Sequence, residues 1–369
     1  MTPILIVILV ALIFEYINGF HDTANSIATV VSTKVLTPRQ AVVLAALTNL
    51  LGAMWGTAVA KTISSGLVHM DAVSPQILIC SLFGAIVWNL LTWWMGLPSS
   101  SSHALVGGLC GAALAAAHND WGVLIFSVPS ARHWWEGKGL WWKVIVPMIT
   151  SPMFGLTLGF LMMGILYFLL RNWRPRTVNV IFGKLQMLSS ASMGFMHGTN
   201  DAQKTMGIIA LALAAATKAG VFDSLPGWLN FLRVAEPERD KPLEIAVWIK
   251  VLCAVTMAAG TAAGGWRIIK TLGQKMVKLQ PVHGFAAETT SATVIFLATH
   301  LGIPVSTTHN ISAAIMGVGA ARRLSAIKWT VVERIVWAWI LTIPVTGLIA
   351  YVLVRALQTL GTIPALPST

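Results

Sequence analysis

The chain has 369 residues, of which 56% are apolar and only 10% are charged, and its formal net charge is +12. Soluble proteins carry roughly 25% charged residues, so this composition excludes a soluble enzyme, a disordered chain and a small disulfide-stabilised secreted domain. A nucleic-acid-binding protein is also disfavoured, because the basic residues lie in short loops between long apolar runs. The composition predicts an all-α, polytopic membrane protein.

The predicted elements are long apolar helices, since a membrane-spanning helix needs about 20 mostly apolar residues. The first run has no basic segment before it, so we expect a retained helix and not a cleaved signal peptide. In chain order, the apolar runs cover 3–33, 38–60, 74–96, 98–118, 143–170, 181–216, 243–264, 284–301, 303–321 and 330–357.

Two of these runs, 3–33 and 181–216, are longer than a bilayer requires. Each contains a polar string, at 18–25 in the first run and at 197–204 in the second, and apolar sequence resumes after each string. This pattern predicts two broken helices, because polar backbone is tolerated within a membrane where it lines a cavity.

Two Pro-Ser motifs indicate an internal repeat. Residues 96–103 read GLPSSSSH and residues 302–309 read GIPVSTTH, at an offset of 206. The polar strings match at an offset of 179, and the difference of 27 is about the length of a polar insert at 217–243. We therefore predict two units, 1–170 and 171–369, each with one broken helix and one re-entrant helical hairpin that turns at the Pro-Ser motif.

Each unit crosses the membrane an odd number of times, whether the hairpin arms span or re-enter, so an inverted repeat is expected. The loops at 34–39, 171–184, 265–281 and 322–334 hold 14 basic residues and one acid, whereas the remaining loops hold eight of each. The positive-inside rule then predicts that both termini lie on the non-cytoplasmic side.

Four acidic residues remain within the apolar runs: Glu15, Asp22, Asp201 and Glu288. An ionised group at the bilayer centre costs at least ~2.5–3.5 kcal/mol, so such residues persist mainly where they bind something. Asp22 and Asp201 lie in the polar strings and are predicted to be functional, as is Glu288. For Glu15, a position near the interface or a packing contact remains an alternative.

The two Ser/Thr-rich tips could together form an anion site. Each tip follows a proline, so a new helix is expected to begin there with unpaired amides and a partial positive charge. Hydroxyl groups and the charge of Lys204 would add to this site, and carboxylates beside it make sense if a cation or proton accompanies the anion. The alternative is that these hydroxyls only cap helices or join neighbouring helices.

Four motifs resemble those of the inorganic phosphate transporter (PiT) family, and most closely its bacterial low-affinity branch. They are GFHDTANSIAT at 19–29, HGTNDAQK at 197–204 and the two tips at 96–103 and 302–309. The motifs occur in the family's order, and the resemblance covers nearly the whole chain. The resemblance implies an alternating-access symporter of inorganic phosphate without a prosthetic cofactor, located in a bacterial inner (plasma) membrane. The coupling ion is expected to be a proton, with sodium as the alternative; sulfate or a metal–phosphate complex are alternative substrates.

The resemblance also implies which residues act. Residues expected at the substrate are Asn25, Ser100, Ser101, Ser102, Gln203, Lys204, Ser306, Thr307 and Thr308. Residues expected at the coupling proton or ion are Asp22, Asp201, Glu288 and Asn49, and the three acids would bind sodium if sodium is the coupling ion. Accessory residues are His21, Thr23, His103, His197, Asn200 and His309.

Asn49 stands where sodium-coupled members of the family carry a glutamate, and Glu288 is expected to be the symmetry-related acid. With asparagine at this position, the chain lacks one carboxylate that would suit sodium as a hard oxygen ligand, and this absence favours proton coupling. The sequence has no GxSxG, HExxH or Walker motif, which argues against an enzyme. An anion channel or a phosphate sensor that does not transport remains an alternative, and a homodimer within the lipid bilayer is a further expectation.

Overall fold

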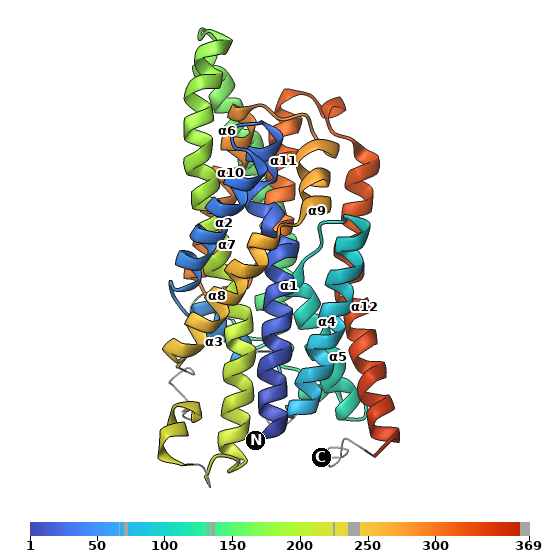
Figure 1. The fold of residues 1–369 in the computed structure, drawn as a ribbon. Coiled ribbons are helices and arrows are strands. Elements are labelled where there is room, and N and C mark those ends of the chain that lie inside the picture. Colours follow the sequence, from blue (N-terminus) through green and yellow to red (C-terminus); the bar gives the residue numbers. More distant parts are fainter. Residues whose placement is uncertain are drawn as a thin grey trace.

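The computed structural model describes the chain over residues 1–65, 67–69, 73–130, 133, 137–223, 226–234 and 244–361. Over these ranges the chain is helical, with isolated β-bridges but no named strand. The predicted all-α class is therefore confirmed. Most of the helices run along the long axis of the molecule, and the start of α1 and the end of α12 lie at the same end (Figure 1).

The helices follow one another in the same order twice: a long helix, a pair of helices joined by a break, a hairpin and a closing helix. The first set is α1 (Thr2–Ser32), α2 (Pro38–Ala53), α3 (Ala58–Ser65), α4 (Pro75–Met95), α5 (Ser101–Ala116) and α6 (Val146–Leu170), with a π-helical turn at Trp141–Ile145 before α6. The second set is α7 (Pro175–Lys218), α8 (Val247–Ala263), α9 (Trp266–Lys270) with a π-helical turn at Thr271–Lys275, α10 (Pro281–His300), α11 (Thr307–Arg322) and α12 (Trp329–Thr359).

Local sequence sets many of the helix starts. Proline occupies the first position of α2, α4, α7 and α10, where its missing N–H costs no hydrogen bond. At the start of α2, the hydroxyl group of Thr37 and the side chain of Gln40 form a capping box. At the end of α4, Gly96 adopts a left-handed φ of 68°, which glycine adopts without steric cost.

The chain is a multi-pass membrane protein. In the described ranges, four helical segments are long and apolar enough to cross a membrane, and six if each bent pair is one span. The outer face of α1 shows why: the side chains of Leu5, Leu9 and Ile13 are about half exposed. Such apolar surface suits contact with lipid tails.

The structure corrects the positions of the predicted breaks. α1 and α7 remain continuous helices through 18–25 and 197–204, so the expected breaks at these strings are wrong. Neither string contains proline, and its side chains find partners on neighbouring helices without unwinding of the backbone. The breaks lie instead between α2 and α3 and between α8 and α9, with bends of 69° and 59°. Gly56 and Gly264, with φ of 79° and 73°, allow these turns.

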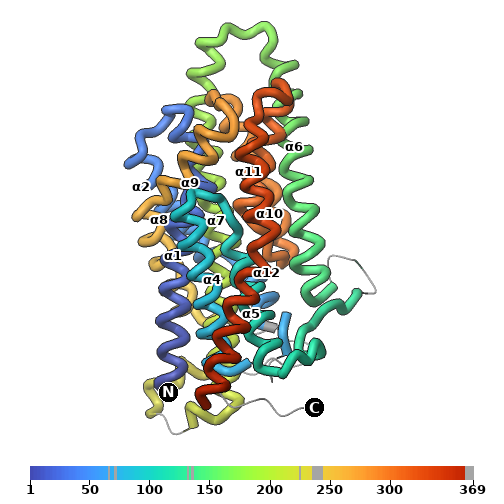
Figure 2. The backbone as a smooth tube through the Cα atoms, turned by 90° about the vertical axis from the view of Figure 1, so that its right-hand side faces the viewer, coloured from blue at the N-terminus to red at the C-terminus, as the bar shows by residue number. Residues whose placement is uncertain are grey.

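The two hairpins meet at their tips. α4 packs on α5 and α10 packs on α11, and the ring centroids of His103 and His309 lie 4.8 Å apart. Hairpin α4–α5 occupies the half of the molecule that contains the N-terminus, and α10–α11 occupies the other half (Figures 1 and 2). Each closing helix packs on the hairpin of the other set: α6 packs on α11, and α12 packs on α5.

Of the predicted polar insert at 217–243, residues 224–225 and 235–243 lie outside the described residues. The described part contains a 3-10 helix at Gly227–Leu232. It returns to the end of α7 through a hydrogen bond of 3.3 Å from the Val234 amide to Thr217 Oγ1.

Candidate functional site

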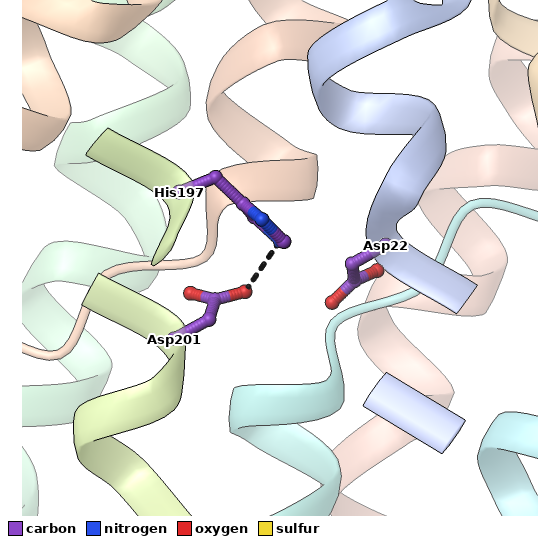
Figure 3. Close-up of side chains that lie close together, drawn as sticks. All are labelled: Asp22, His197 and Asp201. Carbon is purple, nitrogen blue, oxygen red and sulfur yellow. Dashed lines mark ion pairs between the residues drawn. The ribbon is translucent and has the colours of Figure 1, made fainter. Parts of the chain in front are cut away.

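The candidate site lies where α1 and α7 face the tips of both hairpins. Figure 3 shows Asp22 on one side of this centre and His197 with Asp201 on the other. The polar side chains of the centre are buried: Asp22, Asp201 and Lys204 are 2%, 1% and 3% exposed. Ionisable groups at such burial are costly unless they are paired or bind a ligand.

Asp22 contacts both hairpin tips. Its carboxylate accepts a hydrogen bond from the hydroxyl of Ser101, and another of 3.2 Å from Thr308 Oγ1. Its Oδ1 also lies 2.8 Å from His21 Nδ1. The hydroxyl of Ser101 lies 2.6 Å from Oδ1 of Asn18, the first residue of the polar string, which was not among the predicted site residues. One carboxylate of α1 is therefore linked to α5 and α11 together.

Asp201 forms an ion pair with Lys204, the cation of the centre. Its Oδ1 lies 2.6 Å from Lys204 Nζ, and its Oδ2 lies 3.1 Å from His197 Nε2. Thr307 Oγ1 donates a hydrogen bond of 3.1 Å to the same Oδ2. The carboxylate thus joins α7 to the tip of the second hairpin.

Lys204 and Asn25 bring donors to the tips. Lys204 Nζ donates to the hydroxyl of Ser102 and, at 3.2 Å, to the carbonyl oxygen of Val305, so it reaches both hairpins. Asn25 Nδ2 donates to Thr307 Oγ1 at 3.2 Å and to Thr308 Oγ1 at 2.9 Å. Ammonium and amide donors beside two helix N-termini are the groups that bind an oxyanion.

Two of these hydrogen bonds occur twice, between residues related by the offsets of 179 and 206 found in the sequence motifs. The equivalent pairs are Asp22–Ser101 with Asp201–Thr307, and Asn25–Thr308 with Lys204–Ser102. The repeated motifs therefore make repeated contacts.

Two of the predicted substrate hydroxyls serve as helix caps. Ser100 Oγ accepts a hydrogen bond of 3.2 Å from the His103 amide at the start of α5, and Ser306 Oγ accepts one of 3.1 Å from the His309 amide at the start of α11. Here the alternative interpretation of the tips, helix capping, is the one that the structure shows. The other predicted substrate hydroxyls bond to side chains of α1 and α7; they are those of Ser101, Ser102, Thr307 and Thr308.

Other predicted residues point away from the tips. Gln203 Oε1 accepts hydrogen bonds from the amides of Val59 and Ala60, at 2.8 and 3.3 Å, so it caps the start of α3. Asn200 Nδ2 donates to Thr299 Oγ1 of α10 at 2.8 Å. Successive helical residues turn by about 100°, so neighbours in one string reach different helices.

Thr23 and the two tip histidines take part in packing. Thr23 Oγ1 donates to the backbone carbonyl oxygen of Gly19 at 2.5 Å. The ring of His309 stacks on Trp339 at 4.2 Å, and neither of its nitrogens has a hydrogen-bond partner in the described part of the chain. The rings of His103 and His309 pack edge to face between the tips.

Glu288 lies in a separate buried polar cluster between α1, α7 and α10. Its carboxylate accepts hydrogen bonds from the hydroxyls of Thr29 and Ser189 and one of 3.3 Å from Gln186 Nε2. Sequence reasoning did not predict these three partners. Thr29 ends the motif at 19–29, but Gln186 and Ser189 lie outside every motif. The site therefore has a central group of side chains and a satellite carboxyl.

Asn49 lies on α2, whereas Glu288 lies on α10, so they do not occupy equivalent elements and their expected symmetry is wrong. Asn49 Nδ2 donates to Thr261 Oγ1 at 2.9 Å, and its Oδ1 lies 3.1 Å from His197 Nδ1. Asn49 is thus connected to the carboxylate of Asp201 through the imidazole of His197.

The centre also offers ligands for a cation. Ligand atoms of Asp22, His197 and Asp201 all lie within 4.8 Å of one another, and all three residues are buried. Carboxylate oxygens with nearby hydroxyls form a hard oxygen donor set, whereas an imidazole nitrogen is suited to proton exchange. The same residues can therefore hold a metal cation or protons.

A helical membrane protein with paired hairpin tips and buried acids at its centre has the features of a secondary transporter. The sequence model described as "Phosphate transporter family" matches residues 18–177 and 170–350, and the chain belongs to this family. It is thus a transporter and not an enzyme, and the resemblance seen in the motifs is confirmed.

Curated relatives agree over almost the whole chain. A "Probable low-affinity inorganic phosphate transporter" of Bacillus subtilis (strain 168) is 40% identical over 94% of this chain and 96% of its own length. A protein of the same name from Rhizobium meliloti (strain 1021) is 42% identical over 94% of this chain and 95% of its own. A solved structure, "The sodium-dependent phosphate transporter", shares the fold with a TM-score of 0.78 at 24% identity, covering 97% of this chain and 100% of its own.

Proposed function

We propose that the protein is a symporter that carries inorganic phosphate with protons across a bacterial inner membrane. The observation that carries this proposal is the meeting of both hairpin tips with Asp22, Asp201 and Lys204 in one buried centre. Phosphate would take the hydroxyl and ammonium donors that now bind one another. The family and the names of the relatives support phosphate as the anion.

Electrostatics explains why positive charge must travel with the anion. The centre holds two carboxylates, Asp22 and Asp201, against one ammonium group, Lys204. A phosphate mono- or dianion would add further negative charge within a few ångströms, where like charges in a low dielectric repel strongly. Protonating one or both carboxylates removes this repulsion, and a bound cation would do the same.

Proton coupling is favoured because each central carboxylate has a histidine as its neighbour. His21 Nδ1 lies 2.8 Å from Asp22, and His197 Nε2 lies 3.1 Å from Asp201. Histidine exchanges protons readily near neutral pH. Asn49 also contacts His197 but carries no charge, so it adds no carboxylate for a sodium ion. Glu288, outside the centre, would bind a further coupling proton.

Sodium coupling is the second candidate. The cluster of Asp22, His197 and Asp201 supports it, since two carboxylates and nearby hydroxyls could coordinate a hard cation. In either case we propose alternating access by rocking of two inverted repeats, 1–170 and 171–369, with both termini on the non-cytoplasmic side. A homodimer remains a prediction.

The test is uptake of radiolabelled phosphate by purified protein in liposomes, with a pH gradient and a sodium gradient imposed separately. Proton symport predicts accumulation driven by the pH gradient when choline replaces sodium. Accumulation with a sodium gradient alone would establish the second candidate instead. Excess sulfate should not compete, and downhill flux without accumulation would indicate a channel.

A further inference from the structure

Glu15 is a buried acid of α1 that the proposed function leaves without a role. The residue is 0% exposed. One carboxylate oxygen accepts a hydrogen bond from the hydroxyl of Thr205, and the other, Oε1, has no hydrogen-bond partner among the described residues. Leaving a buried polar atom unsatisfied costs about 1–3 kcal/mol, so this position is not explained by packing alone.

The position of Glu15 relative to the centre is regular. Glu15 precedes Asp22 by seven residues in the continuous helix α1, which places them on one face about 10.5 Å apart along the axis. Its partner Thr205 lies one turn beyond Asp201 on α7. Glu15 therefore lies about two helical turns from Asp22, toward the end of the molecule where α1 begins.

The same spacing occurs on the other side of the centre. Thr29 follows Asp22 by seven residues on α1, and its hydroxyl donates to the carboxylate of Glu288. Glu15 and Glu288 thus bracket the central aspartates along the interface of α1 and α7, one on each side. Carboxyl groups in such a row occur in proton pathways of transporters.

Among the described residues, no cation is paired with Glu15. The neutral side chain of Asn18, one turn along α1, acts on its carboxyl. The charged groups that act on it are Asp201 and Lys204 of α7, which are of opposite sign, and Cys253 of α8 is its titratable neighbour. Lys204 is already paired with Asp201 at 2.6 Å. An unpaired carboxylate within a membrane is costly, so binding a proton would relieve a real cost at this position.

We propose that Glu15 is a proton-binding site of the transport cycle, on the opposite side of the anion centre from Glu288. This proposal rests on the proposed proton-coupled function. A hydronium ion gives its proton to a carboxylate oxygen of Glu15: one O–H bond of hydronium breaks, the O–H bond of the carboxylic acid forms, and water is left. The reverse transfer to water releases the proton, which is thereby co-transported with the anion.

The test compares two activities of Glu15→Gln in proteoliposomes. Glutamine keeps the size of the side chain and an oxygen that can accept from Thr205, but it cannot release a proton. We expect accumulation driven by a pH gradient to fall at least ~10-fold, while exchange of labelled for unlabelled phosphate at equal pH stays within about twofold of the wild type. Glu333→Gln is the matched control, because Glu333 is exposed, and it should leave both activities unchanged.

Unchanged accumulation in Glu15→Gln would overturn the proposal, and so would loss of both activities in a folded protein, which would show a structural role. If the wild type itself does not respond to a pH gradient, the proposed proton coupling fails first, and the two failures are distinguishable. Should Glu15→Gln not fold, Thr205→Val is the second variant. It removes the hydrogen bond but keeps the acid, so the pH profile of accumulation should shift, and an unshifted profile would contradict the proposal.

Discussion

Replacing Lys204 with methionine would remove the cation of the centre while keeping most of the side chain's length. Lys204 Nζ lies 2.6 Å from Asp201 Oδ1, and the two side chains are 3% and 1% exposed. Removing one partner of a buried ion pair costs about 3–5 kcal/mol, because the other charge stays buried. Since His197 and Thr307 still contact the carboxylate, we expect Lys204→Met to lower the free energy of unfolding by about 3 kcal/mol.

The double variant Asp201→Asn with Lys204→Met separates folding from transport. With both charges of the pair removed, neither partner is left as an unpaired charge, so the free energy of unfolding should return to within about 1 kcal/mol of the wild type. Transport should stay lost, because the anion has lost its ammonium group and the coupling carboxylate. This difference is what distinguishes a functional ion pair from a structural one.

The assay is reversible unfolding in mixed detergent micelles with increasing SDS, followed by phosphate uptake in proteoliposomes. Lys250→Met is the matched control, because Lys250 is partly exposed on α8 and has no partner within the described ranges, and it should change stability by less than ~0.5 kcal/mol. Wild-type stability of Lys204→Met, or wild-type uptake by the double variant, would refute the reasoning.

Three further outcomes are expected. Asp22→Asn should fold but lose at least ~10-fold in uptake rate, because both tips donate to its carboxylate; uptake near the wild-type rate would contradict its role. Gly198→Ala should lower the free energy of unfolding by ~1–3 kcal/mol, since its methyl group would meet the backbone of α2, whereas Gly164→Ala has open space and should be neutral or stabilising in the same SDS titration. Gln203→Ala should cost ~1 kcal/mol by uncapping α3, and an unchanged unfolding curve would argue against the cap.

The helices were largely predictable because apolar runs and prolines mark them. The positions of the breaks were not. A polar string such as 18–25 looks the same whether its backbone unwinds or whether its side chains bind a neighbour, and only the tertiary contacts decide. The real bends depend on Gly56 and Gly264, which lie in apolar sequence without a polar signal.

Expecting broken helices at the polar strings also limited the prediction of the site. The repeated motifs correctly brought Asp22, Asp201 and the tips together, because those side chains share a chemical pattern. In a continuous helix, however, Lys204 faces the centre while its neighbour Gln203 faces α3. The partners of Glu288 come from two other helices. Thr29 ends the motif of α1, but Gln186 and Ser189 of α7 belong to no motif, so no local pattern could have identified the whole set.

The position of the anion is measured most directly by diffraction from crystals grown with arsenate, whose anomalous signal marks an oxyanion of nearly the size of phosphate. We expect one strong peak between the hairpin tips, with its oxygens within about 2.7–3.2 Å of the hydroxyls of Ser102 and Thr308 and of Lys204 Nζ. A peak elsewhere, with the tips still bonded to Asp22 and Asp201 in the same crystal, would contradict the assignment of this centre as the transport site.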